Sequence, residues 1–269
     1  MPTPILAMIP SGFKTSKFAS VLPNDGTGDF TVVRNSSKTR VNSLGLIETL
    51  AVNVIAPDYT GGGCPVLKIE PQSTNLLPYS NDFTEFSGGT RLAGYLSPDG
   101  SNNAYNISHS GGVTYSYNPT NTRTTDTRTI WARTVTGTGL IHLCSFNGNS
   151  NNLFTVTEEW QRFEVIGYTS VGADAFYAAD FRGSSTLTEI IVWGAQAENI
   201  AGANATSNIA TNGGIATRFA DIVTVDTSLI SGTITSIIET IGGVDQTPIT
   251  TIPATYTIPV GNINKITMQ

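Results

Sequence analysis

Residues 127–135 read TRTIWARTV, a run in which apolar and polar side chains alternate. In an extended strand, successive side chains point to opposite faces of the sheet. Ile130 and Ala132 therefore face one side, whereas Trp131 and Arg133 face the other. This pattern predicts a β-strand whose apolar side lies away from Trp131.

Similar short runs recur along the chain, separated by turn-forming residues. The runs span residues 29–33, 40–50, 66–69, 104–108, 140–146, 161–168, 175–181, 188–194 and 221–225. Clusters of Asn, Asp, Gly and Pro, which favour turns, lie at 24–26, 61–63, 97–100, 147–149 and 212–214. No segment keeps apolar residues at helical spacing for three turns. The sequence therefore predicts an all-β fold, either a sandwich or a barrel.

The composition excludes several classes of function. The chain has 269 residues and a formal net charge of -6, which argues against nucleic acid as a partner because phosphates are held by clustered Lys and Arg. No apolar run approaches the roughly 18 residues of a membrane span, so we expect no membrane insertion. The start, Met-Pro-Thr-Pro, lacks the features of a secretory signal, which predicts synthesis in the cytoplasm. With only Cys64 and Cys144 as thiols, we expect no metal and no cofactor.

Changes in composition suggest three parts. Residues 1–74 are rich in Pro, Gly and Asn, and are expected to form an extended N-terminal arm that attaches the protein. Residues 75–225 contain all three tryptophans and the most regular strand signals, which predicts the central sandwich. Residues 226–269 alternate Ile and Thr with little charge, a pattern that pairs readily at a sheet edge. This last segment is expected to pack on another copy, on a partner, or as a docked terminus.

Several motifs of the sequence, taken in order, resemble those of fibre and appendage proteins of tailed bacteriophages. They are TRVNSLGLIE (39–48), DYTGGGCP (58–65), EPQSTNLL (70–77), YSNDF (79–83), SPDGSNNAY (97–105), EWQRF (159–163), VWGAQ (192–196), ATS (205–207) and ATRFAD (216–221). The resemblance covers roughly residues 20–225. It implies a jelly-roll-like antiparallel β-sandwich similar to carbohydrate-binding modules, displayed on a virion as a homotrimer.

The sequence also departs from that family. Ala56 stands where the family commonly has Arg, and Lys68 and Ile69 stand where it has Leu-Leu. Many members continue into a second sandwich or a catalytic module, whereas only the Ile/Thr segment follows here. The departures favour a short fibre, an adaptor or a decoration subunit over a depolymerising enzyme.

Trp131 and Arg133 are the candidate glycan-binding residues. An exposed indole stacks on a sugar ring, and a neighbouring guanidinium binds hydroxyls or a carboxylate. Tyr115 and Tyr117, which alternate on a nearby segment, carry a similar and weaker suggestion. The alternative is that Trp131 packs beneath a loop or at a subunit contact. Trp160, by contrast, is expected to anchor the core.

Catalytic chemistry is not indicated by the sequence. Glycoside hydrolysis needs two carboxylates across a cleft, and the adjacent Glu158 and Glu159 point to opposite faces of an extended chain. The resulting hypothesis is a virion structural protein, not an enzyme, whose sandwich binds host surface glycans and whose arm binds capsid or tail proteins. One alternative is a capsid- or tail-stabilising subunit that acts through protein contacts alone. A polysaccharide-degrading enzyme is the weaker alternative.

Overall fold

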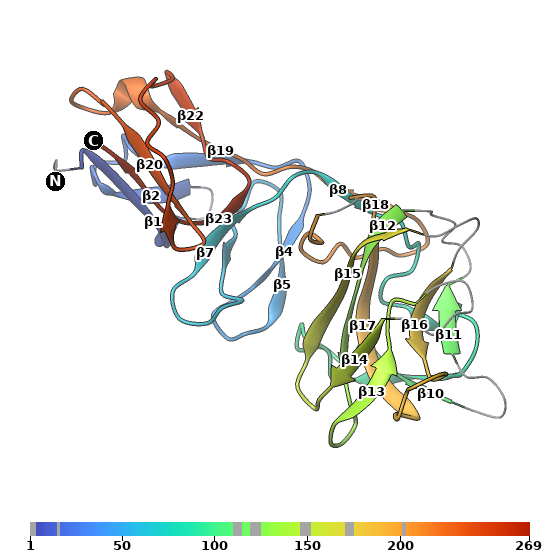
Figure 1. Cartoon of the computed structure of the whole chain (residues 1–269). Coiled ribbons are helices and arrows are strands. Elements are labelled where there is room, and N and C mark those ends of the chain that lie inside the picture. The colour runs from blue at the N-terminus through green and yellow to red at the C-terminus, as the bar shows by residue number, and fades with distance from the viewer. Residues whose placement is uncertain are drawn as a thin grey trace. The chain divides into compact units, whose positions relative to one another are not determined.

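The computed structural model describes residues 4–14, 17–109, 115–118, 125–145, 152–169, 175–200 and 203–269. Within these ranges the regular structure is strand, apart from two short 3₁₀ segments, η1 (Phe83–Glu85) and η2 (Thr227–Leu229). The prediction of an all-β chain is thus confirmed. Two compact units are present (Figure 1): a sandwich unit, Ser73–Thr217, and a terminal unit made of Met1–Gln72 together with Arg218–Gln269.

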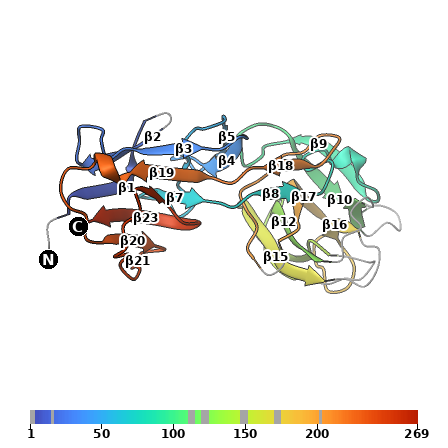
Figure 2. The ribbon, with the colours of Figure 1, turned by 90° about the horizontal axis from the view of Figure 1, so that it is seen from above.

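The sandwich unit contains two antiparallel sheets. In the larger sheet the strands follow the order β15-β12-β17-β10-β9, while β8 pairs with β17 and β18; Figure 2 shows this succession. Its strands are β8 (Ser73–Asn75), β9 (Thr90–Tyr95), β10 (Ala104–Ser108), β12 (Thr125–Arg133), β15 (Gln161–Thr169), β17 (Glu189–Glu198) and β18 (Ala216–Arg218). The smaller sheet has the order β11-β16-β13-β14. Its strands are β11 (Tyr115–Asn118), β13 (Gly139–His142), β14 (Leu153–Val156) and β16 (Phe176–Asp180).

The core of the sandwich unit takes apolar side chains from both sheets. Ile130 and Val192 come from the larger sheet, and Ile141 and Phe176 from the smaller one; all four are fully buried. Burial on this scale is the main stabilising term of a β-sandwich. The arrangement is consistent with the predicted antiparallel sandwich.

A bulge in β17 changes which residues face this core. Three residues of β12, from Thr129 to Trp131, lie opposite four of β17, from Trp193 to Gln196. Gly194 has a φ of 64°, the left-handed conformation that glycine adopts without steric cost. Because of the extra residue, Ala195 faces the core whereas Trp193 faces away from it. The sequence alternation alone would place Trp193 and Ala195 on one face.

The terminal unit is a second sheet system, with strands from both ends of the chain. Its main path is β21-β20-β23-β1-β2-β3-β19-β22, while β7 pairs with β23 and β6 with β7. These strands are β1 (Leu6–Lys14), β2 (Lys17–Leu22), β3 (Phe30–Val33), β6 (Pro57–Asp58), β7 (Val66–Ile69), β19 (Ile222–Asp226), β20 (Ile237–Ile241), β21 (Val244–Asp245), β22 (Thr255–Thr257) and β23 (Gly261–Met268). A hairpin of β4 (Lys38–Val41) and β5 (Ile47–Leu50) completes the unit.

The three-part division expected from the sequence therefore differs from the structure. Residues 1–74 are not an extended arm, and residues 226–269 are not a separate segment, because β1 pairs with β23 in the register Leu6↔Met268. Leu6, Ile263 and Met268 are fully buried in one shared core. The Ile/Thr segment thus finds its pairing partner within its own chain, which removes most of the exposed edge it would otherwise present.

Candidate functional site

Trp131 and Arg133 lie on the face of β12 that points away from the core, as the alternation predicted. Ile130 and Ala132 are completely buried in the core, whereas Trp131 and Arg133 are half-buried on the opposite face. In the sheet register, Trp131 lies between Arg162 of β15 and Trp193 of β17. Arg162, Trp131 and Trp193 therefore form an aromatic and cationic strip across the outer side of the larger sheet, in which Trp193 is almost completely buried.

Arg133 contacts the ring of Trp160, which was expected to lie in the core. The guanidinium carbon of Arg133 lies 5.4 Å from the centre of the Trp160 ring, a cation–π contact worth about 0.5–1 kcal/mol at an exposed site. Trp160 is thus half-buried outside the core, so its expected role as a core anchor was wrong. It lies immediately before β15 and on the face that the strand alternation gives it, together with Arg162 and opposite to the buried Phe163.

Trp131 and Trp193 differ in how their indole N–H groups are satisfied. Trp193 is 2% exposed and its Nε1 donates a hydrogen bond to Asn103 Oδ1 at 2.7 Å. Trp131 Nε1, by contrast, is buried and has no hydrogen-bond partner in the structure. The Trp131 ring lies against the backbone at Gly194, where an added Cβ would be 3.2 Å from its Cδ1 atom. The indole edge of Trp131 is therefore fixed by the bulge, and its remaining exposed surface is what a ligand would contact.

The other two candidate residues do not join this strip. Tyr115 and Tyr117 lie on β11, which belongs to the smaller sheet, whereas Trp131 and Arg133 lie on the larger one. Their side chains fall outside the described residues. The expectation of a neighbouring segment was therefore wrong in topology, because nearness in sequence does not decide which of two packed sheets a strand joins.

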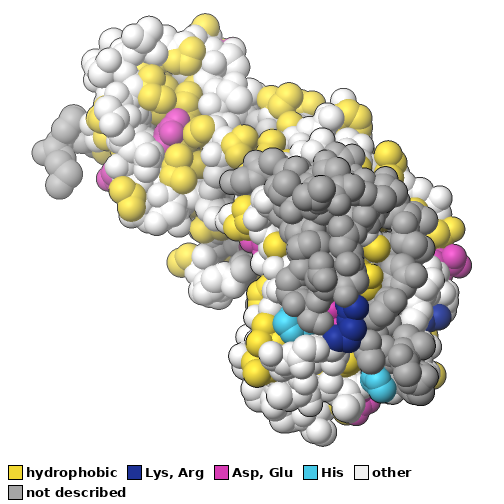
Figure 3. Space-filling model, turned by 45° about the vertical axis from the view of Figure 1, so that its right-hand side comes forward, with side chains coloured by type: hydrophobic (Ala, Val, Ile, Leu, Met, Phe, Trp, Pro, Cys, Tyr) yellow, Lys and Arg dark blue, Asp and Glu magenta, His cyan; other side chains and the backbone are white. Residues whose placement is uncertain are grey.

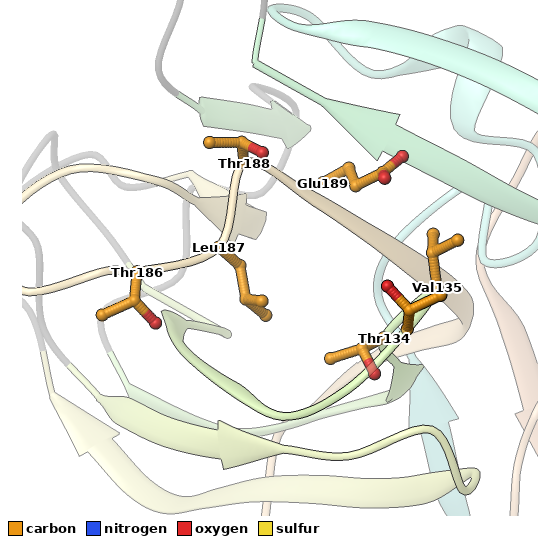
Figure 4. A pocket seen from close by; sticks show the side chains of 7 residues that line it. Thr134, Val135, Thr186, Leu187, Thr188 and Glu189 are labelled. Carbon is orange, nitrogen blue, oxygen red and sulfur yellow. The ribbon is translucent and has the colours of Figure 1, made fainter.

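A small hollow lies at the end of β12, where its lining begins at Thr134, the residue after Arg133. It has a volume of about 170 Å³, and its side chains surround one opening in Figure 4. The hollow is lined by Thr134, Val135, Thr136, Thr186, Leu187, Thr188 and Glu189. The Glu189 carboxylate accepts a hydrogen bond from Asn106 Nδ2 at 2.9 Å. Hydroxyls and one carboxylate can bind the hydroxyl groups of a polar ligand, but a single carboxylate does not make a hydrolytic pair.

Several motif residues meet in a buried polar network around Glu198 of β17. The fully buried carboxylate of Glu198 accepts hydrogen bonds from Ser73 Oγ, Gln196 Nε2 and the backbone N–H of Thr206. Asn75 Nδ2 donates to the carbonyl of Ile209 at 2.9 Å. These contacts tie two distant segments, 73–77 and 205–209, to β17. Buried polar groups of this kind must be paired, so the motifs serve the architecture.

Three further motif residues, Glu70, Arg218 and Asp221, form a buried ion network with Arg34 and Lys38 in the terminal unit. Asp221 binds Arg34 Nη1 at 3.0 Å and Lys38 Nζ at 2.6 Å, and Glu70 binds Lys38 Nζ at 3.1 Å. Arg218 lies 3.8 Å from Glu70 and 3.9 Å from Asp221. All five side chains are at most 5% exposed. Sequence reasoning missed this network; the signal was three charged residues, Glu70, Arg218 and Asp221, inside motifs of a chain with only 13% charged residues.

The described residues were also searched for metal sites and for membrane-spanning helices. The Asp99 carboxylate, a conceivable calcium ligand, accepts from Ser101 N at 2.9 Å and from Ser97 Oγ at 2.6 Å, which is the bonding of a plain turn. Across the described ranges, no cluster of His, Cys, Asp and Glu has the arrangement of a metal site. The same part of the chain has no helix that is long and apolar enough to span a bilayer.

The sequence was compared with protein-family models and with curated proteins. No family model and no curated protein matches it. The likeness to phage fibre proteins therefore remains a resemblance carried by short motifs.

Proposed function

We propose that this chain is a structural subunit of a phage virion, a fibre, adaptor or decoration protein, whose sandwich unit binds host surface glycans without hydrolysing them. The observation that carries the glycan part is the Arg133–Trp160 stack beside the half-buried Trp131, next to a threonine-lined hollow. Aromatic faces, a guanidinium and hydroxyls are the groups that bind sugar rings and their substituents. Weak single sites of this kind give useful avidity on a multivalent particle.

The virion part of the proposal rests on the motif resemblance and on surface chemistry. The motifs that carry the resemblance contribute residues to both buried networks, among them Glu70, Thr206 and Asp221, which is expected of residues that define an architecture. On the face in Figure 3, the described Lys and Arg side chains form no broad basic patch. That distribution fits a glycan or protein partner better than a nucleic acid.

A second candidate, a subunit acting through protein contacts alone, is favoured by an apolar patch on the terminal unit. Val33, Phe219 and Ile222 are 48%, 45% and 48% exposed and line a hollow of about 190 Å³. Val33 and Ile222 are direct neighbours in the register of β3 and β19.

The same patch is where copies of the proposed homotrimer would meet. Light scattering should then give three times the chain mass of 28.4 kDa, and Phe219→Ser should reduce it.

Glycan-array binding separates these functions. We expect binding that is lost in Arg133→Gln and Trp131→Ala but kept in Leu92→Ala, a matched change of an exposed side chain on β9 of the same sheet. Circular dichroism should show all three variants folded. An empty array together with tight binding to capsid or tail proteins would favour the protein-contact subunit. Release of reducing ends from host polysaccharide would favour the enzyme.

A further inference from the structure

Lys38 is a buried lysine that lies between two carboxylates. Its side chain is 1% exposed, and its Nζ lies 2.6 Å from Asp221 Oδ2 and 3.1 Å from Glu70 Oε2. The third Nζ–H points to the carbonyl oxygen of Lys68 at 2.6 Å. An amine, a carboxyl group and a second carboxylate are therefore held together in a site with almost no access for water.

The carboxyl group of Asp221 is fixed from its other side. Arg34 Nη1 donates to Oδ1 at 3.0 Å, and the backbone N–H of Glu70 donates to Oδ2 at 2.9 Å. Arg34 itself is held by three backbone carbonyls, those of Ser36, Ala51 and Val54. The guanidinium is thus a preorganised donor at the oxygen that would gain negative charge if a nucleophile added to the Asp221 carboxyl carbon.

We propose that Lys38 and Asp221 condense to form an isopeptide bond. Glu70 accepts a proton from the Lys38 ammonium, and the lone pair of Nζ then attacks Cγ of Asp221, with Oδ1 stabilised by Arg34. The bond from Cγ to Oδ2 breaks, and Oδ2 leaves as water with two of the three ammonium protons. The third proton remains on the new amide nitrogen, so atoms and charges balance and no oxidant is needed.

Two physical features favour this reaction. Fixed contact between the two groups replaces a bimolecular encounter, which is worth effective concentrations of about 10⁵ M or more when the geometry is productive. Water is the product, and a site this dry does not supply it for the reverse hydrolysis. The same desolvation makes the separated ions costly to keep, whereas an amide is neutral.

The bond would covalently link the two sequence segments that make up the terminal unit. Lys38 begins β4, and Asp221 directly precedes β19, 183 residues later. Every residue of the sandwich unit lies between them. The two parts of the terminal unit would stay joined after a cut within Ser73–Thr217, which suits a protein exposed to proteases. This inference does not rest on the proposed function.

Mass spectrometry of the denatured full-length chain tests the proposal. The expected mass is that of the sequence less one molecule of water. Trypsin should release residues 35–40 joined to residues 219–265, because a modified Lys38 is not cleaved. Lys38→Arg and Glu70→Gln, checked for folding by circular dichroism, should retain the full mass. Asp221→Asn should lose ammonia instead and give the same product mass as the wild-type chain.

Lys17→Arg, which changes an exposed lysine of β2 in the same unit, is the matched control and should keep the cross-link. A folded wild-type chain with the full sequence mass and separate peptides would overturn the proposal and leave the network as ion pairs. A water loss confined to peptides with Asp25-Gly26 or Asp99-Gly100 would overturn it too, because those pairs form cyclic imides.

Discussion

Replacement of Gly194 by alanine tests the bulge that places Trp131 and Trp193. Gly194 has a φ of 64°, and an added Cβ would lie 3.0 Å from Asn208 Oδ1 and 3.2 Å from Trp131 Cδ1. The left-handed conformation costs a non-glycine residue about 1–2 kcal/mol, and crowding in a packed site adds about 1–3 kcal/mol. Gly194→Ala should therefore lower the free energy of unfolding of the sandwich unit by about 2–5 kcal/mol.

Gly137→Ala is the matched control, because it carries the conformational cost without the crowding. Gly137 has a φ of 68°, and an added Cβ would have no neighbour within 4 Å. The free energy of unfolding of this variant should fall by only about 1–2 kcal/mol. Urea unfolding followed by tryptophan fluorescence measures both variants, since all three tryptophans lie in the sandwich unit. Equal losses for the two variants would refute the argument, because the contacts of Gly194 would then contribute nothing.

Three further predictions concern single groups. Glu198→Ala should destabilise the sandwich unit by about 3 kcal/mol or more in the same urea assay, because buried donors from three residues lose their acceptor; a loss near zero would contradict the buried network. Native protein should react with a disulfide thiol reagent only at the exposed Cys64, because burial raises the pKa of the Cys144 thiol far above its ordinary value; reaction of both thiols without denaturant would show that Cys144 is accessible. The Thr84 hydroxyl, by hydrogen bonding to Asp82, holds the pKa of that carboxyl below its usual range. Its stabilisation is present above about pH 4 and lost as the pH falls through the depressed pKa, so the stability difference between wild type and Asp82→Asn should shrink on acidification; an unchanged difference down to about pH 2 would argue against it.

Local alternation predicted β12 well and β17 only in part. Ile130 and Ala132 are in the core and Trp131 and Arg133 outside it, because the period of two holds along an unbroken strand. In β17 the period fails at Gly194, where one extra residue moves everything after it to the other face. A glycine within a strand run was the available signal for this bulge.

From the sequence, the candidate site could be predicted only where its residues lie on one and the same strand. Trp131 and Arg133 could be assigned to one face from their spacing. The contact of Arg133 with Trp160 depends on the register between β12 and β15, and the hollow beside it depends on a turn and a strand start about 50 residues apart. Neither is encoded in any local period.

The printed sequence is enough to establish the all-β class, the low surface charge and the buried side of β12, because each follows from composition or from neighbours one or two positions apart. The pairing of β1 with β23, the meeting of Lys38 with Asp221, and the hydrogen bond from Ser73 to Glu198 emerge only on folding. These contacts join residues more than a hundred positions apart, and they form because burying their apolar and polar partners together outweighs the entropy of closing such long loops.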